Sequence, residues 1–306
     1  MPSPQPVYRG RFAPSPTGPL HFGSLLAALG SCLEARQNQG AWLLRIEDID
    51  LPRNVHGAAE DIRKTLEAFG FEWDGEPLWQ SRRTAAYAAA LEQLRQQGLV
   101  YPCACSRREI ADSASRAAID GGLAYPGTCR SGLTAGRQPR AWRLRVDQRE
   151  TRFEDRIQGC VAQHLETDVG DFVLLRADGI YAYQLAVVVD DAEQGITDIV
   201  RGADLLASTP RQIWLQHCLG LPTPGYAHLP VATNAAGEKL SKQTLAPALD
   251  PATAAGTLRR ALDFLGQNPP AELADGSIAE IWHWAVLHWR IDSVPRQPGI
   301  VAEHGR

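Results

Sequence analysis

Long hydrophobic runs are missing from this sequence. None of its apolar stretches approaches the ~18 residues that a membrane-spanning helix needs. The first ten residues, MPSPQPVYRG, lack the apolar core of a secretory signal peptide. We therefore expect a cytoplasmic protein without a membrane-bound part. Thiols stay reduced in that compartment, so the 6 cysteines raise a question of metal binding or burial and not of disulfide pairing.

Internal repeats, low-complexity tracts and Gly/Ser linkers are also absent, and so are a Walker A loop and a G-x-G-x-x-G fingerprint. A phosphate site, if present, therefore belongs to neither of those two classes. A net charge of −4 carries no overall signal for nucleic-acid binding. The 306 residues, 44% hydrophobic and 22% charged, describe an ordinary soluble protein with one large or two ordinary domains.

Positive charge is concentrated between Arg137 and Arg156. Arginines stand there at positions 137, 140, 143, 145, 149, 152 and 156. One interpretation is a surface that contacts phosphates, and therefore a candidate docking face for RNA. The other is a solvated strand face, because Arg143 and Arg145 alternate with apolar residues. We favour the strand face for most of the run, since acidic residues from Asp147 to Asp155 dilute the charge.

The stretch from Arg11 to Ser24 reads RFAPSPTGPLHFGS. An apolar lead predicts a strand, the prolines and glycine exclude a helix interior, and apolar residues at helical spacing follow from Leu25. A strand, a tight turn and a helix start present backbone N–H groups and the positive end of the helix to an anion. His21 could contact a phosphate there. Taken alone, the stretch is equally suited to a rigid turn that closes one βα unit, and we favour that turn at this point.

Strand and helix patterns alternate along much of the chain, which favours an α/β sheet with ligands at the carboxyl ends of its strands. The run 182–189 is almost continuously apolar and predicts a central parallel strand, with Asp190 and Asp191 at its end. Further strands are expected at 41–50, 141–146, 172–176, 196–201 and 227–234. Helices are expected at 54–70, 82–97, 210–220, 252–265 and 276–290. The Trp and His residues of the last helix are expected to pack between helices.

Residues 99–140 interrupt this alternation with a polar segment that has too few apolar residues for a core of its own. Cys103 and Cys105 flank one residue, and Cys129 follows with Tyr125 four positions before it. Zinc bound by thiolates is one interpretation, with a fourth ligand from elsewhere. Three unrelated cysteines are the other, and the spacing does not decide between them.

A polar loop, GEKLSKQT, covers residues 237–244. Lys239 and Lys242 around a serine could form a mobile clamp for an anion. By itself the segment is equally an ordinary surface loop.

Three separated segments together resemble one family. RFAPSPTGPLHFGS and LLRIEDID look like the start of a glutamyl-tRNA synthetase. HFGS at 21–24 resembles the first signature of class I aminoacyl-tRNA synthetases, usually written HIGH, and KLSKQ at 239–243 resembles the second, KMSKS. Either short match alone is weak, but both in this order, with glutamate-type flanks, are specific. The resemblance covers the chain from about Val7 to the last helices.

The end of the chain departs from a full glutamyl-tRNA synthetase, because the residues after Gln243 cannot hold its helical anticodon-binding region. The resemblance is therefore to the truncated paralogues of the family, the glutamyl-Q tRNA(Asp) synthetases. It implies a Rossmann-type parallel sheet in two halves, 1–98 and 171–245, the second with the KMSKS-like loop. It also implies a zinc-stapled insertion at 99–170 and a short helical region at 246–306, without an anticodon-binding domain. The four zinc ligands it implies are Cys103, Cys105, Tyr125 and Cys129.

The resemblance also implies roles for individual residues. His21 and Lys242 would be catalytic. The ATP-binding residues would be His21, Gly23, Ser24, Lys239 and Lys242, with Mg²⁺ accompanying ATP. Glutamate carboxylates call for the planar fork of arginine, and its ammonium group for a carboxylate. The implied glutamate-binding residues are Arg11, Ala13, Ser15, Glu47, Tyr183 and Arg201.

The implied activity is tRNA-independent activation of L-glutamate with ATP, followed by transfer to queuosine at the wobble position of tRNA(Asp). The partners would be ATP, L-glutamate and the anticodon stem-loop of that tRNA, and we expect a monomer. One alternative is a short glutamyl-tRNA synthetase that charges a tRNA 3′ end. Others are a catalytically inactive paralogue that only binds tRNA, and a nucleotidyltransferase for a small metabolite.

Overall fold

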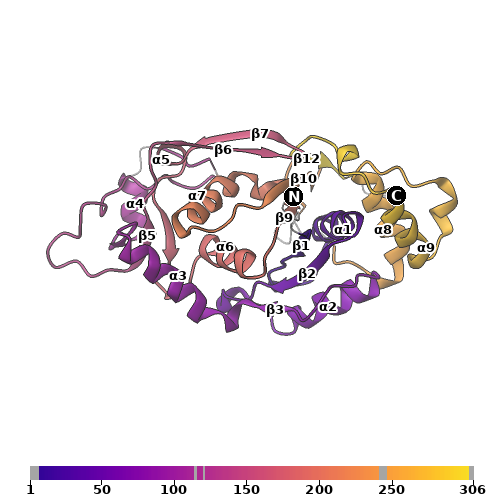
Figure 1. Ribbon diagram of the computed structural model, residues 1–306, viewed down its shortest axis with the longest axis horizontal. Helices are drawn as coiled ribbons and strands as arrows, with labels where there is room; N and C mark the ends of the chain where they lie inside the picture. The colour runs from indigo at the N-terminus through magenta and orange to yellow at the C-terminus, as the bar shows by residue number, and fades with distance from the viewer. Residues whose placement is uncertain (1–6, 114–115, 120, 241–246, 303–306) are drawn as a thin grey trace, which may run out of the picture.

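The computed structural model describes residues 7–113, 116–119, 121–240 and 247–302. Parallel strands occupy its centre, and helices flank them in an elongated molecule (Figure 1). One half of the centre has the parallel strands β1 (Arg9–Phe12), β2 (Ala41–Ile46) and β3 (Leu78–Trp79). The other half has the order β7-β6-β10-β9. Its strands are β6 (Glu150–Asp155), β7 (Gly159–His164), β9 (Asp198–Gly202) and β10 (Gly225–Leu229).

The two halves adjoin where β1 lies beside β9. The backbone N–H of Thr197 donates to the Arg9 carbonyl at 3.0 Å, and the Arg9 N–H donates to the Thr197 hydroxyl. Strands β9 and β10 run parallel, as do β6 and β10, whereas β6 and β7 form an antiparallel hairpin. The predicted α/β architecture with a parallel sheet is therefore confirmed. The carboxyl ends of β1, β2, β9 and β10 carry the candidate site.

Six helices lie close to the predicted positions. They are α1 (Phe22–Gln37), α2 (Ala58–Ala68), α3 (Thr84–Gln96), α7 (Thr209–Leu219), α8 (Ala254–Phe264) and α9 (Ile278–His288). Helix α1 is the central one, in contact with β1 and β9 on one side and with α8 and α9 on the other. Gly30 permits this packing, because a Cβ there would lie 2.6 Å from a methyl carbon of Leu229 on β10.

The predicted central strand at 182–189 is wrong. This segment forms most of the helix α6 (Tyr183–Glu193), which packs against α3, α7 and the strand β8 (Phe172–Leu175). Every residue from Leu185 to Asp191 is buried. An apolar run that is buried on all sides has no periodicity to distinguish a helix from a strand, which is why the pattern misled. Asp190 and Asp191 therefore belong to the end of a helix and not of a strand.

The segment 99–170 contributes the strands β4 (Val100–Cys103) and β5 (Ala141–Leu144), which form a small antiparallel sheet with β8. It also contributes the short helices α4 (Arg107–Ser113) and α5 (Leu165–Asp168). The arginines of its 137–156 run are largely engaged within the protein. Arg143 and Arg145 lie over the rings of Tyr125 and Tyr101. The ion pairs are Arg137–Glu109, Arg149–Asp147, Arg152–Glu150 and Arg156–Glu34. This favours the strand-face interpretation over a continuous phosphate-binding patch.

The C-terminal helices α8 and α9 lie at one end of the molecule, beside α1 and α2 (Figure 1). The indole N–H of Trp289 donates to buried Glu34 of α1, and that of Trp282 donates to the Phe69 carbonyl after α2. Trp284 and His288 stack on one another at the surface, so the α9 aromatics form only part of a helix–helix core. Strands β11 (Val231–Thr233) and β12 (Gly299–Val301) pair nearby. In the part of the chain that the structure describes, no helix combines the length and apolar character of a membrane span.

Candidate active site

A cavity of about 1030 Å³ opens at the carboxyl ends of β1, β2, β9 and β10. It is lined by ten of the residues that the sequence predicted for the site: Arg11, Ala13, Ser15, His21, Gly23, Ser24, Glu47, Tyr183, Arg201 and Lys239. Lys242 lies outside the described residues. The structure thus brings the two predicted groups, one for ATP and one for glutamate, into a single cavity.

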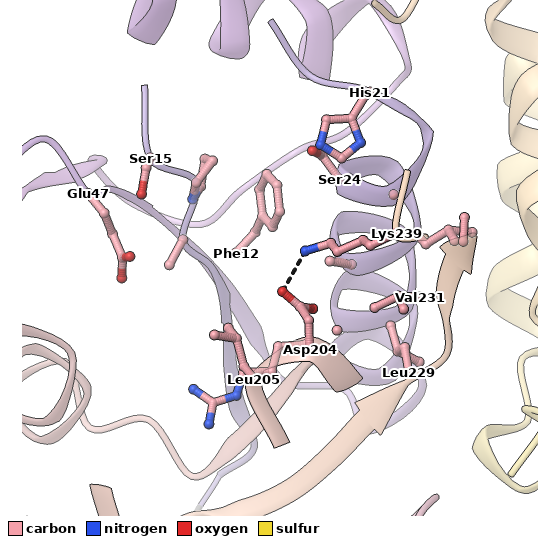
Figure 2. Close-up of a pocket in the computed structure, with 18 of the residues that line it drawn as sticks. Phe12, Ser15, His21, Ser24, Glu47, Asp204, Leu205, Leu229, Val231 and Lys239 are labelled. Atoms are coloured by element: carbon pink, nitrogen blue, oxygen red, sulfur yellow. Dashed lines mark hydrogen bonds and ion pairs between the residues drawn. The ribbon is translucent and has the colours of Figure 1, made fainter. Parts of the chain in front are cut away.

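The cavity has two ends of different character. Figure 2 shows His21, Ser24 and Lys239 on one side, near the start of α1, and Glu47 with Ser15 on the other. Phe12 lies between them in this view. A polyanion and a zwitterion could therefore occupy adjacent parts of the same space.

The first end is built on the N-terminus of α1. His21 precedes the helix in an extended conformation, with φ −127° and ψ 176°, and no acidic residue lies in the first turn. Gly23 lets the histidine ring come close, because a Cβ at this position would lie 3.2 Å from the His21 Cε1 atom and 3.3 Å from Nδ1. The backbone N–H groups and the positive end of the helix suit an anion such as a phosphate.

The second end contains a buried network of charges. Asp191 accepts from Arg11 Nε at 3.1 Å and from Arg45 Nη1 at 2.8 Å, and Arg45 Nη2 lies 3.4 Å from Glu47 Oε1. Burial raises the pKa of Glu47 to about 7, although the guanidinium groups of Arg45 and Arg11 oppose this rise. In Asp191 those two arginines outweigh burial and lower the pKa. Glu47 therefore has one cationic partner at moderate distance and can accept a second cation.

Arg201 extends into the cavity from β9, and its direct hydrogen-bond partners among the described residues are neutral. Its Nε donates to His228 Nε2 at 3.0 Å, and its Nη2 donates to Thr209 Oγ1 and to Gln212 Oε1, each at 2.8 Å. Its Nη1 lies 3.4 Å from the hydroxyl of Tyr183, which also lines the cavity. Arg11, by contrast, is already paired with a carboxylate. The two predicted carboxylate ligands therefore differ in their charge environment.

Several residues of the site had not been singled out from the sequence. Asp204, three positions after Arg201, lines the cavity and forms an ion pair with Lys239 (Figure 2). Arg45 forms an ion pair with Asp191, and His228 accepts a hydrogen bond from Arg201. Asp204 follows the end of a predicted strand, a position that could have indicated it. Arg45 and His228 lie within apolar strands and gave no comparable signal.

A second cluster lies in the 99–170 segment. The Sγ atoms of Cys103, Cys105 and Cys129 all lie within 4.8 Å of one another. The Tyr125 hydroxyl lies 3.4 Å from Cys103 Sγ and 3.6 Å from Cys105 Sγ, and it accepts from the backbone N–H of Cys129 at 2.9 Å. Three soft thiol donors and one phenol oxygen thus converge, and this cluster could hold a metal ion.

The surroundings of the cluster favour ionisation of one thiol, that of Cys129, whereas burial raises the pKa of Cys105 to about 11 and also raises that of Tyr125. Burial opposes ionisation of the Cys129 thiol, but hydrogen bonds from Tyr125 and from the backbone N–H of Ala104 outweigh it and lower its pKa to about 7. The guanidinium carbon of Arg143 lies 3.8 Å from the centre of the Tyr125 ring. A cation at this distance offsets part of the negative charge that thiolates and a phenolate would carry.

Comparison with known proteins places these two sites in a family context. The family model "tRNA synthetases class I (E and Q), catalytic domain" matches residues 8–263. The chain belongs to this family. The predicted membership of the class I synthetases, which are ligases, is therefore confirmed.

This class I synthetase has close relatives among curated sequences. It is 71% identical over 290 residues to the glutamyl-Q tRNA(Asp) synthetase of Dechloromonas aromatica, a match that covers 95% of this chain and 96% of that protein. It is 63% identical over 292 residues to the protein of the same name from Chromobacterium violaceum, covering 95% and 97%. A crystal structure of glutamate-tRNA synthetase from Elizabethkingia anophelis superposes with a TM-score of 0.79 at 27% identity, covering 97% of this chain and 69% of that one.

Proposed function

We propose that this chain activates L-glutamate with ATP, without tRNA, and then transfers the glutamyl group to queuosine at the wobble position of tRNA(Asp). The observation that carries the proposal is the single cavity in which the α1 N-terminus and the Glu47–Arg201 region meet. The relatives named glutamyl-Q tRNA(Asp) synthetase support the choice of acceptor.

In the first step an α-carboxylate oxygen of glutamate attacks the α-phosphorus of ATP. The bond from this phosphorus to the oxygen that bridges to the β-phosphate breaks, and pyrophosphate leaves. Positioning and charge stabilisation account for most of such catalysis. His21, Gly23 and Ser24 would hold the phosphates at the helix start, and Lys239 and Lys242 would neutralise their charge. Mg²⁺ would enter with ATP, and we assign it no protein ligands.

Glutamate would bind at the other end of the cavity with its three charges matched. Arg201 would bind one carboxylate and Arg11, which shares Asp191 with Arg45, would contact the other. Glu47 would accept the ammonium group. The Tyr183 hydroxyl, together with Ala13 and Ser15, would complete the pocket.

In the second step a hydroxyl of the queuosine cyclopentene-diol would attack the acyl carbon of the adenylate, and AMP would leave. An anticodon loop is a suitable substrate because its bases can be splayed out of the stack and read individually. We propose that 1–98 and 171–245 form the catalytic halves, with 246–306 as a short C-terminal region. ATP and tRNA are cytoplasmic substrates, so we expect the enzyme there, and we expect it to act as a monomer.

We further propose that Cys103, Cys105, Tyr125 and Cys129 hold one structural Zn²⁺. When bound, the ion would staple the segment 99–170, whose own apolar cluster is small. Its role would be to hold the fold of this insertion next to the catalytic halves, without taking part in the reaction.

The test uses two assays. Glutamate-dependent exchange of labelled pyrophosphate into ATP in the absence of tRNA measures the first step. Transfer of labelled glutamate is then compared on queuosine-containing tRNA(Asp), unmodified tRNA(Asp) and tRNA(Glu). We expect exchange without tRNA and transfer only to the queuosine-containing tRNA.

Each alternative gives a different result. Charging of tRNA(Glu), or equal charging with and without queuosine, would favour a short glutamyl-tRNA synthetase. Binding of tRNA without any exchange would favour an inactive paralogue. Either result would refute the proposed function.

A further inference from the structure

A buried chain of polar contacts lies behind Arg201 and involves residues to which no role has been assigned. Strand pairing creates it: His228 on β10 is the register partner of Arg201 on β9, and β6 delivers Asp155 beside β10. His228 Nδ1 lies at hydrogen-bond distance from Asp155 Oδ2, and His228 Nε2 accepts from Arg201 Nε at 3.0 Å. The His228 side chain is fully buried and that of Arg201 nearly so. The three side chains therefore form a line from the interior to the cavity.

The contacts determine which imidazole nitrogen carries the proton. Arginine N–H groups can only donate, so His228 Nε2 must be the acceptor and the proton must lie on Nδ1, where it is donated to Asp155. Burial lowers the pKa of His228 to about 4, so that the ring is neutral under physiological conditions. Asp155 is itself held by backbone N–H groups of Ile157, Gln158 and His228 that donate to its Oδ1.

This arrangement fixes Arg201 without neutralising it directly. Its Nε and Nη2 are engaged with His228, Thr209 and Gln212, which are all uncharged. Among the described residues, no carboxylate lies within 4.0 Å ion-pair distance of Arg201. A buried guanidinium that is oriented by neutral acceptors keeps its charge for an anionic ligand, and Nη1 has a second N–H besides the one directed at the Tyr183 hydroxyl.

We propose that His228, oriented by Asp155, is a positioning residue that aims Arg201 at the side-chain carboxylate of the amino-acid substrate. The inference rests on the proposed function, which it deepens by explaining how glutamate is selected. Glutamine has a neutral amide where glutamate has its side-chain carboxylate, so only glutamate places a negative charge beside Arg201. A guanidinium held in another direction would therefore distinguish the two amino acids less well.

The test replaces the acceptor nitrogen. His228→Phe keeps a ring but removes both contacts, whereas His228→Gln keeps an oxygen that can accept from Arg201 Nε. In glutamate-dependent ATP–pyrophosphate exchange we expect His228→Phe to raise KM for glutamate about tenfold or more, with KM for ATP within about twofold. His228→Gln should recover part of the loss. Discrimination between glutamate and glutamine should fall most in His228→Phe and less in His228→Gln.

Tyr226→Phe provides a matched control on the same strand. It removes a buried hydrogen bond from Gln216 to the Tyr226 hydroxyl but keeps the ring that lies against Arg201 and His228, so the acceptor of Arg201 is unchanged. We expect a lower melting temperature with an unchanged KM for glutamate. If Tyr226→Phe raised KM for glutamate as much as His228→Phe does, the effect would be one of strand stability and the inference would be wrong.

The tautomer gives a readout that does not depend on activity. In ¹⁵N-labelled wild-type protein, the His228 ring should show a protonated Nδ1 and an unprotonated Nε2. A proton on Nε2, or an unchanged KM for glutamate in His228→Phe, would overturn the inference while leaving the proposed function intact. Wild-type protein without glutamate-dependent exchange would refute the proposed function instead, and the ring tautomer would still decide whether His228 holds Arg201.

Discussion

The carboxyl group of Glu47 should make glutamate binding depend on pH near neutrality. Burial raises its pKa to about 7, and only the ionised form attracts the ammonium group of the substrate. About one carboxyl in ten is then ionised at pH 6 and about nine in ten at pH 8. The dissociation constant for glutamate should therefore be about tenfold higher at pH 6 than at pH 8, or about 1.4 kcal/mol weaker.

Calorimetric titration with glutamate alone measures this difference and avoids the ionisation of ATP. Glu47→Gln should bind glutamate weakly with little pH dependence between 6 and 8. His21→Asn is the control, because the imidazole is the other cavity group whose ordinary pKa lies in this range, and it should keep the tenfold change. A pH-independent wild type, or loss of the pH effect in His21→Asn, would refute the assignment of Glu47.

The raised pKa of Glu47 also has a consequence for folding. The group binds its proton more tightly in the folded protein than in the unfolded chain, where the pKa is about 4.5. Its contribution is therefore most favourable at pH values below 4.5 and is lost as the pH rises through about 7. Glu47→Gln should accordingly flatten the dependence of the unfolding free energy on pH between these values.

Three further perturbations test other parts of the site. Gly23→Ala should lower the rate of ATP–pyrophosphate exchange about tenfold, because the new Cβ would displace the His21 ring. The control is Gly256→Ala on α8, where a Cβ would meet nothing within 4 Å. It should keep full exchange activity, with a free energy of unfolding that is equal or up to about 1 kcal/mol higher. Lys242→Ala should slow activation far more than it weakens glutamate binding, and unchanged exchange would remove this lysine from the mechanism. Chelation should increase hydrogen exchange in 99–140 but spare the parallel sheet, so an unaltered fold and full activity in metal-free protein would contradict the zinc assignment.

Much of the architecture could be predicted from local sequence patterns. The amphipathic helices at 252–265 and 276–290 were found because apolar residues at helical spacing face a core wherever the helix packs. The turn before α1 was found because its prolines exclude a helix and its following residues favour one. These features depend on neighbours along the chain, so the sequence contains them directly.

Other features depend on distant residues. The run 182–189 was predicted as a strand because burial on all sides erases the pattern that separates strand from helix. Asp191 was consequently expected at a strand end, whereas in the structure it pairs with Arg11, 180 positions away. The Arg137–Arg156 run was interpreted mainly as a strand face, but its distant ion-pair partners, such as Glu109 and Glu34, could not be predicted.

The sequence by itself determined the family, the order of most elements and ten residues that line one cavity. It could do so because signature motifs and strand ends are local. Only the tertiary structure decided which partners these side chains have. Arg11 pairs with Asp191, Lys239 pairs with Asp204, and Arg201 donates to His228. The physical reason is that sheet order and register bring Asp155 to His228 across 73 positions, and no spacing along the chain encodes that approach.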